Sequence, residues 1–340
     1  MGVDASEWAS PYNYLSAVRE GLTLPEKVML NDVTLREGIQ ASKVPFDVGK
    51  KVALAQLLDE VGFSQIQIGY PARSDMDKVA IGAIKEAGVG CALEGICTVA
   101  GPQWREEIQA TVDSGVNIVN VALPTSDARL RYVLKMSRDE VLKRAESAVR
   151  LAKSYGHFVV FSPIDTTRTD LSFLKEVLAA VTEAGASRFY IIDTVGTISP
   201  TGMRYLVTEI RKASSISLAI HCHDDFGLAV ANGLAAIECG VEVVDVCVNG
   251  MGKRAGNLSL EEIALALTIF HDKELGIKLE RLYELSRAVA KMTKVPVYDA
   301  KPIVGANAFD FEVDTQLRGA AGHVQHGSVD PAIVGHPGKS

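Results

Sequence analysis

The sequence is poor in cysteine and aromatic residues, has no excess of positive charge and contains no long uninterrupted apolar run. Its five cysteines are scattered, odd in number and never spaced as Cys-x-x-Cys, so a disulfide framework is excluded and reduced, buried thiols are indicated. A net charge of -7 without a basic stripe argues against nucleic acid as a partner. No segment reaches the length of a membrane span, and residues 1–24 lack the apolar core of a signal peptide. We therefore expect a cytoplasmic protein that acts on small molecules and binds neither membranes nor nucleic acid.

What the sequence does contain is a repeated alternation of apolar, β-branched runs with segments of helical period. Hydrophobic residues make up 47% of the chain and charged residues 23%, which is typical of globular proteins. Eight runs predict buried strands, namely residues 28–32, 65–69, 91–97, 117–122, 158–161, 189–193, 217–221 and 243–248. Amphipathic helices are expected between strands over residues 48–61, 138–154, 171–184, 200–213 and 227–239.

Eight β-α units within about 250 residues predict the α/β class and a closed (β/α)8 TIM barrel. The competing open, doubly wound sheet usually has a glycine-rich phosphate turn after its first strand, where this chain has Thr-Leu-Arg-Glu-Gly. After further helices over residues 259–270 and 280–293, the tail becomes rich in proline and glycine. We expect an N-terminal extension over residues 1–26, a catalytic barrel over residues 27–275 and a C-terminal helical and loop-rich lid over residues 276–340.

Polar residues recur at the ends of the predicted strands, where such barrels place their active sites. His221 and His223 are two residues apart on an extended segment, so their imidazoles point to the same side, as two ligands of one metal ion must. Glu37 is the carboxylate we expect as a third ligand, and the amide oxygen of Asn257 would complete a set suited to Mn²⁺, Mg²⁺, Zn²⁺ or Co²⁺. The alternative is a pair of structural histidines with Glu37 as a surface acid.

Two further residues suggest chemistry at a carbonyl group. Arg36 adjoins Glu37, and a cation beside a metal site stabilises negative charge that develops on a carbonyl oxygen. Thr194 would donate a hydrogen bond to a substrate carboxylate. The structural alternatives are a salt bridge from Arg36 to Asp32 or Glu37, and a turn cap at Thr194.

Four motifs in this order resemble the DRE-TIM metallolyase superfamily, which includes 2-isopropylmalate synthase, homocitrate synthase, citramalate synthase and 3-hydroxy-3-methylglutaryl-CoA lyase. They are Asp-Val-Thr-Leu-Arg-Glu-Gly from residue 32, Asp-Thr-Val-Gly from residue 193, His-Cys-His from residue 221 and Gly-Met-Gly-Lys-Arg-Ala-Gly-Asn from residue 250. The resemblance, over residues 27–310, implies that Glu37, His221 and His223 bind the metal with Asn257 near or on it. It also implies that Arg36 polarises a keto oxygen and that Thr194 holds the 2-oxo acid carboxylate.

Within the superfamily, the loop over residues 250–257 and the segment over residues 301–309 resemble the condensing synthases, whereas the lyases carry a reactive cysteine in that loop. The resemblance implies a Claisen-type condensation of an acyl-CoA, with acetyl-CoA as the first candidate, and a 2-oxo acid. The product is a 2-hydroxy-2-substituted dicarboxylic acid. One divalent ion as cofactor, acyl-CoA as co-substrate and a homodimer are also implied.

Several positions depart from the usual pattern of the synthases on the side that binds the 2-oxo acid. The substrate-binding residues implied by the resemblance are Gln40, Asn120, Ser162, Ile164 and Thr194. Synthases usually have glutamate at the position of Ile164, histidine at Asn120, an acid at Gln67 and glutamate at Lys253. We therefore expect an acceptor acid different from the usual one.

The lid departs as well, because Phe311 and Gln316 occupy the stretch where two histidines are usual. We name His323 as the catalytic base, with His326, Glu312 and Asp314 as alternatives. A polar linker without catalytic duty is the structural alternative.

Three other functions fit parts of this pattern. A carbon-carbon lyase or aldolase would use the same metal site for bond cleavage. A non-haem Fe(II) oxygenase also uses two histidines and one carboxylate, although such enzymes are commonly all-β. A non-catalytic metabolite-binding relative would explain the missing lid histidines.

Overall fold

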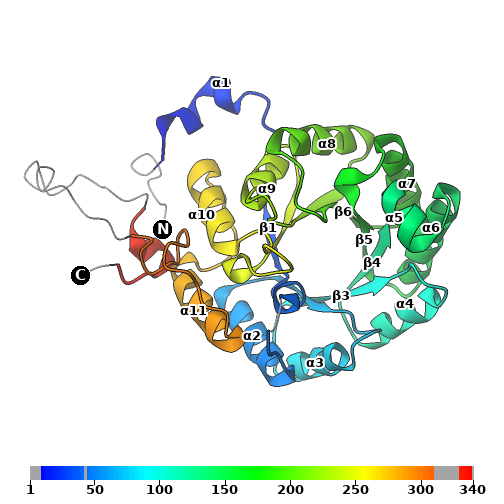
Figure 1. Cartoon of the computed structure of the whole chain (residues 1–340), viewed down its shortest axis with the longest axis horizontal. Coiled ribbons are helices and arrows are strands. Elements are labelled where there is room, and N and C mark those ends of the chain that lie inside the picture. The colour runs from blue at the N-terminus through cyan, green and yellow to red at the C-terminus, as the bar shows by residue number, and fades with distance from the viewer. Residues whose placement is uncertain (1–8, 42–43, 310–328, 339–340) are drawn as a thin grey trace, which may run out of the picture.

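The computed structural model describes residues 9–41, 44–309 and 329–338, and it confirms the predicted TIM barrel. Eight parallel strands form one closed sheet in the order β1 to β8, and β8 pairs with β1 through four residue pairs (Figure 1). The strands are β1 Met29–Asp32, β2 Gln65–Gly69, β3 Ala92–Thr98, β4 Ile118–Pro124, β5 Phe158–Ile164, β6 Arg188–Asp193, β7 Ser217–Cys222 and β8 Val243–Val246.

Most of the helices surround this sheet and bury their apolar faces against it (Figure 1). Polar side chains fix where several begin; for example, Ser137 and Glu140 form a capping box at the start of α6. The helices are α1 Ser16–Arg19, α2 Val48–Val61, α3 Asp75–Glu86, α4 Trp104–Asp113, α5 Asp127–Arg129, α6 Arg138–Ser154, α7 Leu171–Glu183, α8 Pro200–Ala213, α9 Ala229–Ile237, α10 Leu260–His271 and α11 Leu282–Thr293. Within the described ranges, no helix combines the length and the apolar character needed to cross a membrane.

The strand boundaries differ from the prediction mainly at β5. This strand continues to Ile164, so Ser162 and Ile164 belong to the strand and not to the loop after it. Pro163 pairs in register with Leu123 of β4, although proline usually interrupts strands. The longer strand carries both side chains to the mouth of the barrel.

The core has two parts. The larger part lies between strands and helices, and a smaller part fills the inside of the barrel with Ile118, Val160, Tyr190, Ala219 and Val243. Buried polar side chains also occupy the interior. This polar interior supports the site above it.

The described parts of the predicted extension and lid, residues 9–26, 276–309 and 329–338, lie beside the barrel (Figure 1). Tyr14 and Arg19 donate hydrogen bonds to backbone carbonyls at the end of α10. The boundaries that we predicted for the three parts stay a prediction. The predicted base His323 and its alternatives lie outside the described residues.

Candidate active site

The turn after β1 brings Arg36 and Glu37 to the mouth of the barrel. The carboxylate of Asp32 accepts hydrogen bonds from the backbone nitrogen and the hydroxyl of Thr34, each at 2.9 Å, and so holds the turn. Burial raises the pKa of Asp32 to about 7 although both bonds favour its charged form. Arg36 and Glu37 are buried and form an ion pair with each other. The salt bridge expected as a structural alternative for Arg36 is therefore present.

His221 is held by a carboxylate from the neighbouring strand β8. Its Nδ1 lies 2.8 Å from Oδ2 of Asp245, and this contact leaves Nε2 to face the site. Asp245 also accepts hydrogen bonds from Asn31 at 2.8 Å and from Tyr190 at 2.7 Å. His223 follows directly after β7, so both rings lie at the same end of the barrel.

Glu37, His221 and His223 converge into one buried cluster, and one ligand atom from each lies within 4.8 Å of the others. Glu37 Oε1 and His223 Nδ1 have no hydrogen-bond partner among the described residues, although both are buried. Buried polar atoms are normally paired, so these unsatisfied atoms point to a ligand that the protein holds here.

The charge states of the cluster fit a divalent cation. Burial opposes ionisation of Glu37, but Arg36 and the other nearby cationic groups outweigh it and lower the pKa of Glu37 to about 2. Burial and the adjacent His221 ring lower the pKa of His223 to about 3. An ionised carboxylate and a neutral imidazole are the forms that bind metals. One carboxylate and two imidazoles suit a transition-metal ion or magnesium.

Asn257 lies beside the cluster, but its amide oxygen already accepts a hydrogen bond from the backbone. That oxygen accepts a hydrogen bond from the backbone nitrogen of Leu258 at 3.0 Å, while Nδ2 lies 3.1 Å from Nε2 of His221. The side chain would have to rotate before its oxygen reached an ion. Direct ligation by Asn257 therefore stays a prediction.

A cavity of about 240 Å³ opens directly above the cluster. Four of the predicted substrate-binding residues line it: Asn120, Ser162, Ile164 and Thr194. The Thr194 hydroxyl oxygen accepts a hydrogen bond from the backbone nitrogen of Asp165 at 2.9 Å, which leaves its hydrogen free to donate. The other lining residues are Arg36, Glu37, Gln67, Tyr70, Ile96, Ala122, Arg129, Tyr190, Ile192, His221, His223, Asp245 and Lys253.

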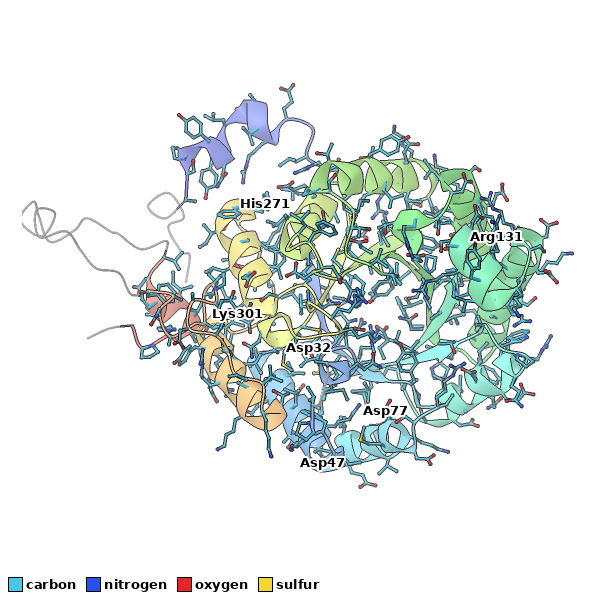
Figure 2. All side chains as sticks on the ribbon, viewed as in Figure 1. Asp32, Asp47, Asp77, Arg131, His271 and Lys301 are labelled. Carbon is cyan, nitrogen blue, oxygen red and sulfur yellow. The ribbon has the colours of Figure 1, made fainter. Side chains whose placement is uncertain are left out.

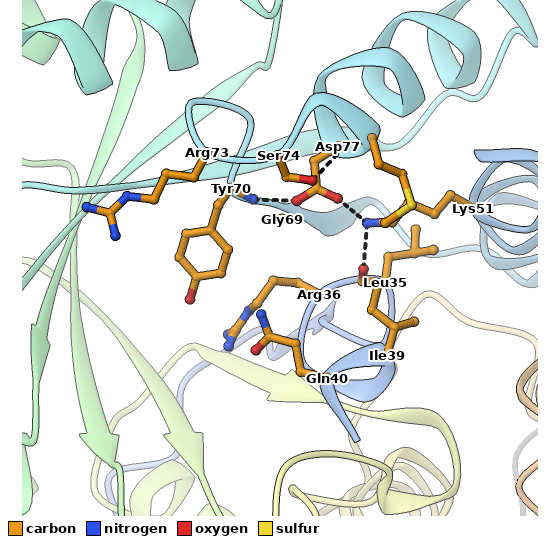
Figure 3. Close-up of a pocket in the computed structure, with 11 residues that line it drawn as sticks. Leu35, Arg36, Ile39, Gln40, Lys51, Gly69, Tyr70, Arg73, Ser74 and Asp77 are labelled. Atoms are coloured by element: carbon orange, nitrogen blue, oxygen red, sulfur yellow. Dashed lines mark hydrogen bonds and ion pairs between the residues drawn. The ribbon is translucent and has the colours of Figure 1, made fainter. Parts of the chain in front are cut away.

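Gln40, the fifth predicted substrate-binding residue, lies elsewhere. It is exposed and lines an adjoining cavity of about 400 Å³, which shares only Arg36 and Tyr70 with the first (Figure 3). The fully buried Lys51 fixes the wall of this second cavity. Its Nζ donates to Leu35 O at 2.9 Å and to Asp77 at 2.6 Å (Figure 3). It also donates to Ile68 O at 2.8 Å.

Glu94 organises the polar interior below the site. It is fully buried and accepts hydrogen bonds from the side-chain amides of Gln67 and Asn120. Burial raises the pKa of Glu94 above its usual value. Gln67 in turn accepts a hydrogen bond from Nε of Arg36. Two residues of the cavity, Arg36 and Asn120, are thus positioned from beneath.

Three residues of the site, Asp245, Tyr190 and Arg129, were not predicted from the sequence. A detectable signal existed for Asp245, because an acid within the apolar run of residues 243–248 is unusual in a buried strand. Arg129 lies on the short helix α5, five residues beyond the end of β4, and no spacing pattern points to it.

Comparison with known proteins identifies the family of this chain. The model of the HMGL-like family matches residues 27–289, which is most of the chain. The chain belongs to the HMGL-like family. The resemblance to the DRE-TIM metallolyases is thereby confirmed.

Among relatives of this HMGL-like protein, homocitrate synthase AksA of Methanothermobacter thermautotrophicus is 39% identical over 305 residues, covering 90% of this chain and 76% of that protein. The 2-isopropylmalate synthase of Methanocaldococcus jannaschii is 36% identical over 321 residues, covering 94% of this chain but only 61% of that protein. In fold, the HMG-CoA lyase of Bacillus subtilis matches with a TM-score of 0.70 at 20% identity, covering 81% of this chain and 96% of that one.

Proposed function

We propose that this protein catalyses a metal-dependent Claisen-type condensation of an acyl-CoA, with acetyl-CoA as the first candidate, and a 2-oxo acid. The balanced reaction consumes water and releases free CoA and a 2-hydroxy-2-substituted dicarboxylic acid. The observation that carries the proposal is the cluster of Glu37, His221 and His223 beneath a lined cavity, with Arg36 beside it. The names of the synthases that match nearly the whole chain support it.

Glu37, His221 and His223 would hold Mn²⁺, Mg²⁺, Zn²⁺ or Co²⁺, with Asn257 beside them. The bound cation supplies Lewis-acid polarisation of a keto group. Arg36 stabilises the negative charge that collects on the keto oxygen as the new carbon-carbon bond forms. Thr194 donates a hydrogen bond to the carboxylate of the acceptor acid. We assign His323 as the base that removes the proton from the acyl group.

The second cavity is where we place the arm of the acyl-CoA. It opens beside Arg36 and Tyr70, which also line the first cavity, so a thioester entering there would reach the acceptor (Figure 3). Gln40 would then contact the acyl-CoA and not the 2-oxo acid. We further propose that the protein is a cytoplasmic homodimer.

The lyase alternative finds less support. The similarity to HMG-CoA lyase at 20% identity concerns the fold alone, and the loop over residues 249–257 has no cysteine. The parallel barrel also argues against the oxygenase alternative.

The proposal is tested by incubating the protein with Mn²⁺, acetyl-CoA and a panel of 2-oxo acids while free thiol is measured. We expect thiol release that depends on one of the acids. Glu37→Gln should lower kcat by on the order of 100-fold or more, because the ionised ligand is lost. The exposed Glu183→Gln is the control and should retain activity. Absence of thiol release with every acceptor, together with cleavage of a 4-hydroxy-2-oxo acid, would instead establish the lyase.

A further inference from the structure

We infer that a cavity on the outer wall of the barrel binds the phosphate group of a small molecule, at a site separate from the candidate active site. The cavity lies between α4 and α6, which pack side by side, and has a volume of about 310 Å³ (Figure 1). It shares no lining residue with the two cavities at the barrel mouth. The inference therefore does not rest on the proposed condensation.

Three cationic side chains line this cavity, namely Arg105 of α4 and Lys143 and Arg144 of α6. Within the described ranges, none of the three forms an ion pair with a carboxylate. Arg150 on the same helix shows the contrast, because its guanidinium lies 3.0 Å from the carboxylate of Glu146. The cavity thus gathers unpaired positive charge on a chain whose net charge is -7.

Glu140 is the only acid among the described residues that line the cavity, and its carboxylate already stabilises the start of α6. Its Oε2 accepts hydrogen bonds from the backbone nitrogen of Ser137 at 2.7 Å and from the Ser137 hydroxyl at 2.8 Å. These two bonds, with Lys143 nearby, lower the pKa of Glu140. One negative charge that is committed to a capping box does not neutralise three cations.

The two arginines of the cavity lie over one aromatic ring. The guanidinium carbons of Arg105 and Arg144 are 4.1 Å and 5.2 Å from the centroid of the buried Trp104 ring. Each cation is attracted to the ring, but the two cations repel each other. Burial, together with the charge of Arg105, accordingly lowers the pKa of Arg144. An anion that contacts both guanidinium groups would offset this repulsion.

Arg144 is held in position before any ligand binds. Its Nη1 donates hydrogen bonds to the backbone oxygens of Val99 at 2.9 Å and Gly101 at 3.0 Å, in the loop that follows β3. Its Nε and Nη2 donate no hydrogen bond to the part of the chain that the structure describes. A guanidinium that is fixed in this way loses little side-chain freedom on binding, and its remaining donors are available to an anion.

The arrangement of the cations favours a phosphate over a carboxylate. A phosphate monoester carries about two negative charges at neutral pH and presents three strong acceptor oxygens. Arg105, Lys143 and Arg144 come from two helices, so each oxygen can meet a different cation. A carboxylate has only two oxygens, which lie in one plane. The cavity volume leaves room for an organic group next to the phosphate, beside the apolar Met136.

The binding test uses the fluorescence of Trp104. The chain contains two tryptophans, so Trp8→Phe leaves Trp104 as the only one. This variant is titrated with inorganic phosphate, glycerol 3-phosphate and succinate at constant ionic strength, and calorimetric titration provides a second measurement. Because the ring lies next to both guanidinium groups, we expect a saturable change in emission, with a Kd of about 1 mM or less for both phosphates. Succinate, which carries carboxylates only, should bind at least about tenfold more weakly.

Two variants remove one cation each. Arg105→Gln and Lys143→Gln should each weaken phosphate binding at least about tenfold, because a hydrogen bond between charged groups is lost. Both side chains are exposed, so the fold should be retained. Arg131→Gln is the matched control, because Arg131 is also exposed on the outside of the barrel and lies 6.0 Å from the ring of Tyr132, but does not line the cavity (Figure 2). It should change the Kd by less than about threefold.

Three binding results would overturn the inference. They are the absence of a saturable response to both phosphates, equal affinity for succinate, and an equal loss of affinity in Arg131→Gln, which would indicate attraction by net charge alone. Thiol release tests the separation from the active site. The KM of acetyl-CoA should be unchanged in Arg105→Gln and Lys143→Gln, and a raised KM would assign the cavity to the acyl-CoA and refute a separate site. Should no acceptor release thiol, the condensation fails while the binding constants still decide the inference.

Discussion

Asp245 shows how one carboxylate inside a strand supports a metal ligand on its neighbour. Its contact with His221 fixes which ring nitrogen faces the site, and Asn31 and Tyr190 saturate its other oxygen. Partners of this kind raise the basicity of a ligating histidine and hold its orientation. Asp245 is therefore a positioning residue.

Asp245→Asn should weaken the affinity for Mn²⁺ by about 10- to 100-fold, because the charge behind His221 is lost. Calorimetric titration with Mn²⁺ measures this directly. Glu238→Gln is the matched control, since Glu238 likewise contacts a histidine, with its Oε1 3.0 Å from Nε2 of His271, but belongs neither to the cluster nor to the cavity above it. It should change the affinity by less than about threefold. An equal loss in both variants would contradict the role and indicate general damage to the interior.

Some residues of the site could be predicted from the sequence and others could not, for physical reasons. The three predicted metal ligands, Glu37, His221 and His223, follow or end predicted strands, and the two-residue spacing of the histidines indicates that their rings point to the same side. They could therefore be assigned to one site before any contact was known. The partnership of Asp165 with Arg129, by contrast, joins residues 36 positions apart in sequence. No periodicity encodes such a contact.

Among the elements, the loop after β8 depends on a glycine for its shape. Gly256 has a φ of +111°, and a Cβ atom there would lie 2.2 Å from the carbonyl oxygen of Gly250. The same oxygen accepts a hydrogen bond from the nitrogen of Asn257 at 2.9 Å. The loop thus places Asn257 beside His221 only while residue 256 lacks a side chain.

Gly256→Ala should lower the free energy of unfolding by at least about 2 kcal/mol, because backbone strain and a clash with a backbone oxygen act together. Urea denaturation measures the change. The control is Gly227→Ala, where φ is +69° but no atom lies within 4 Å of the added Cβ. This variant carries only the conformational cost of about 1 kcal/mol. Equal losses in the two proteins would show that the loop relaxes around the clash.

The strands also show where local rules fail. Seven predicted strands lie close to those observed, because their apolar runs end at polar residues or turns. The predicted fifth strand ended at residue 161, whereas β5 runs through Pro163 to Ile164, because a proline is compatible with a strand when its missing N–H group is not needed. Tertiary pairing with β4 overrode the local signal.

On the scale of the whole molecule, the burial of the cysteine side chains shows how tightly the barrel is packed. All five are free, and four are buried. Burial raises the pKa of Cys91 and Cys97 to about 12, and that of Cys222 and Cys247 well above the usual value. Thiols held in this form are poor nucleophiles.

Treatment of the native protein with a thiol reagent at mildly alkaline pH should therefore modify Cys239 at most, whereas all five react in denaturant. Absorbance of the released reagent gives the count. Cys239→Ser should remove the native reaction and leave the denatured count at four. Rapid modification of several thiols in native buffer would show that the barrel opens locally.

At the mouth of the barrel, the residues of the metal cluster and the apolar residues that line the cavity come from different strands. The metal-ligand candidates Glu37, His221 and His223 come from β7 and from the segments that follow β1 and β7, whereas the apolar lining residues Ile96, Ala122, Ile164 and Ile192 come from β3, β4, β5 and β6. Mutations of the apolar lining residues can therefore change the choice of acceptor while the metal-binding residues stay unchanged. Saturation libraries confined to residues 96, 122, 164 and 192 would therefore yield variants that accept other acids and form new products while they retain the condensation reaction.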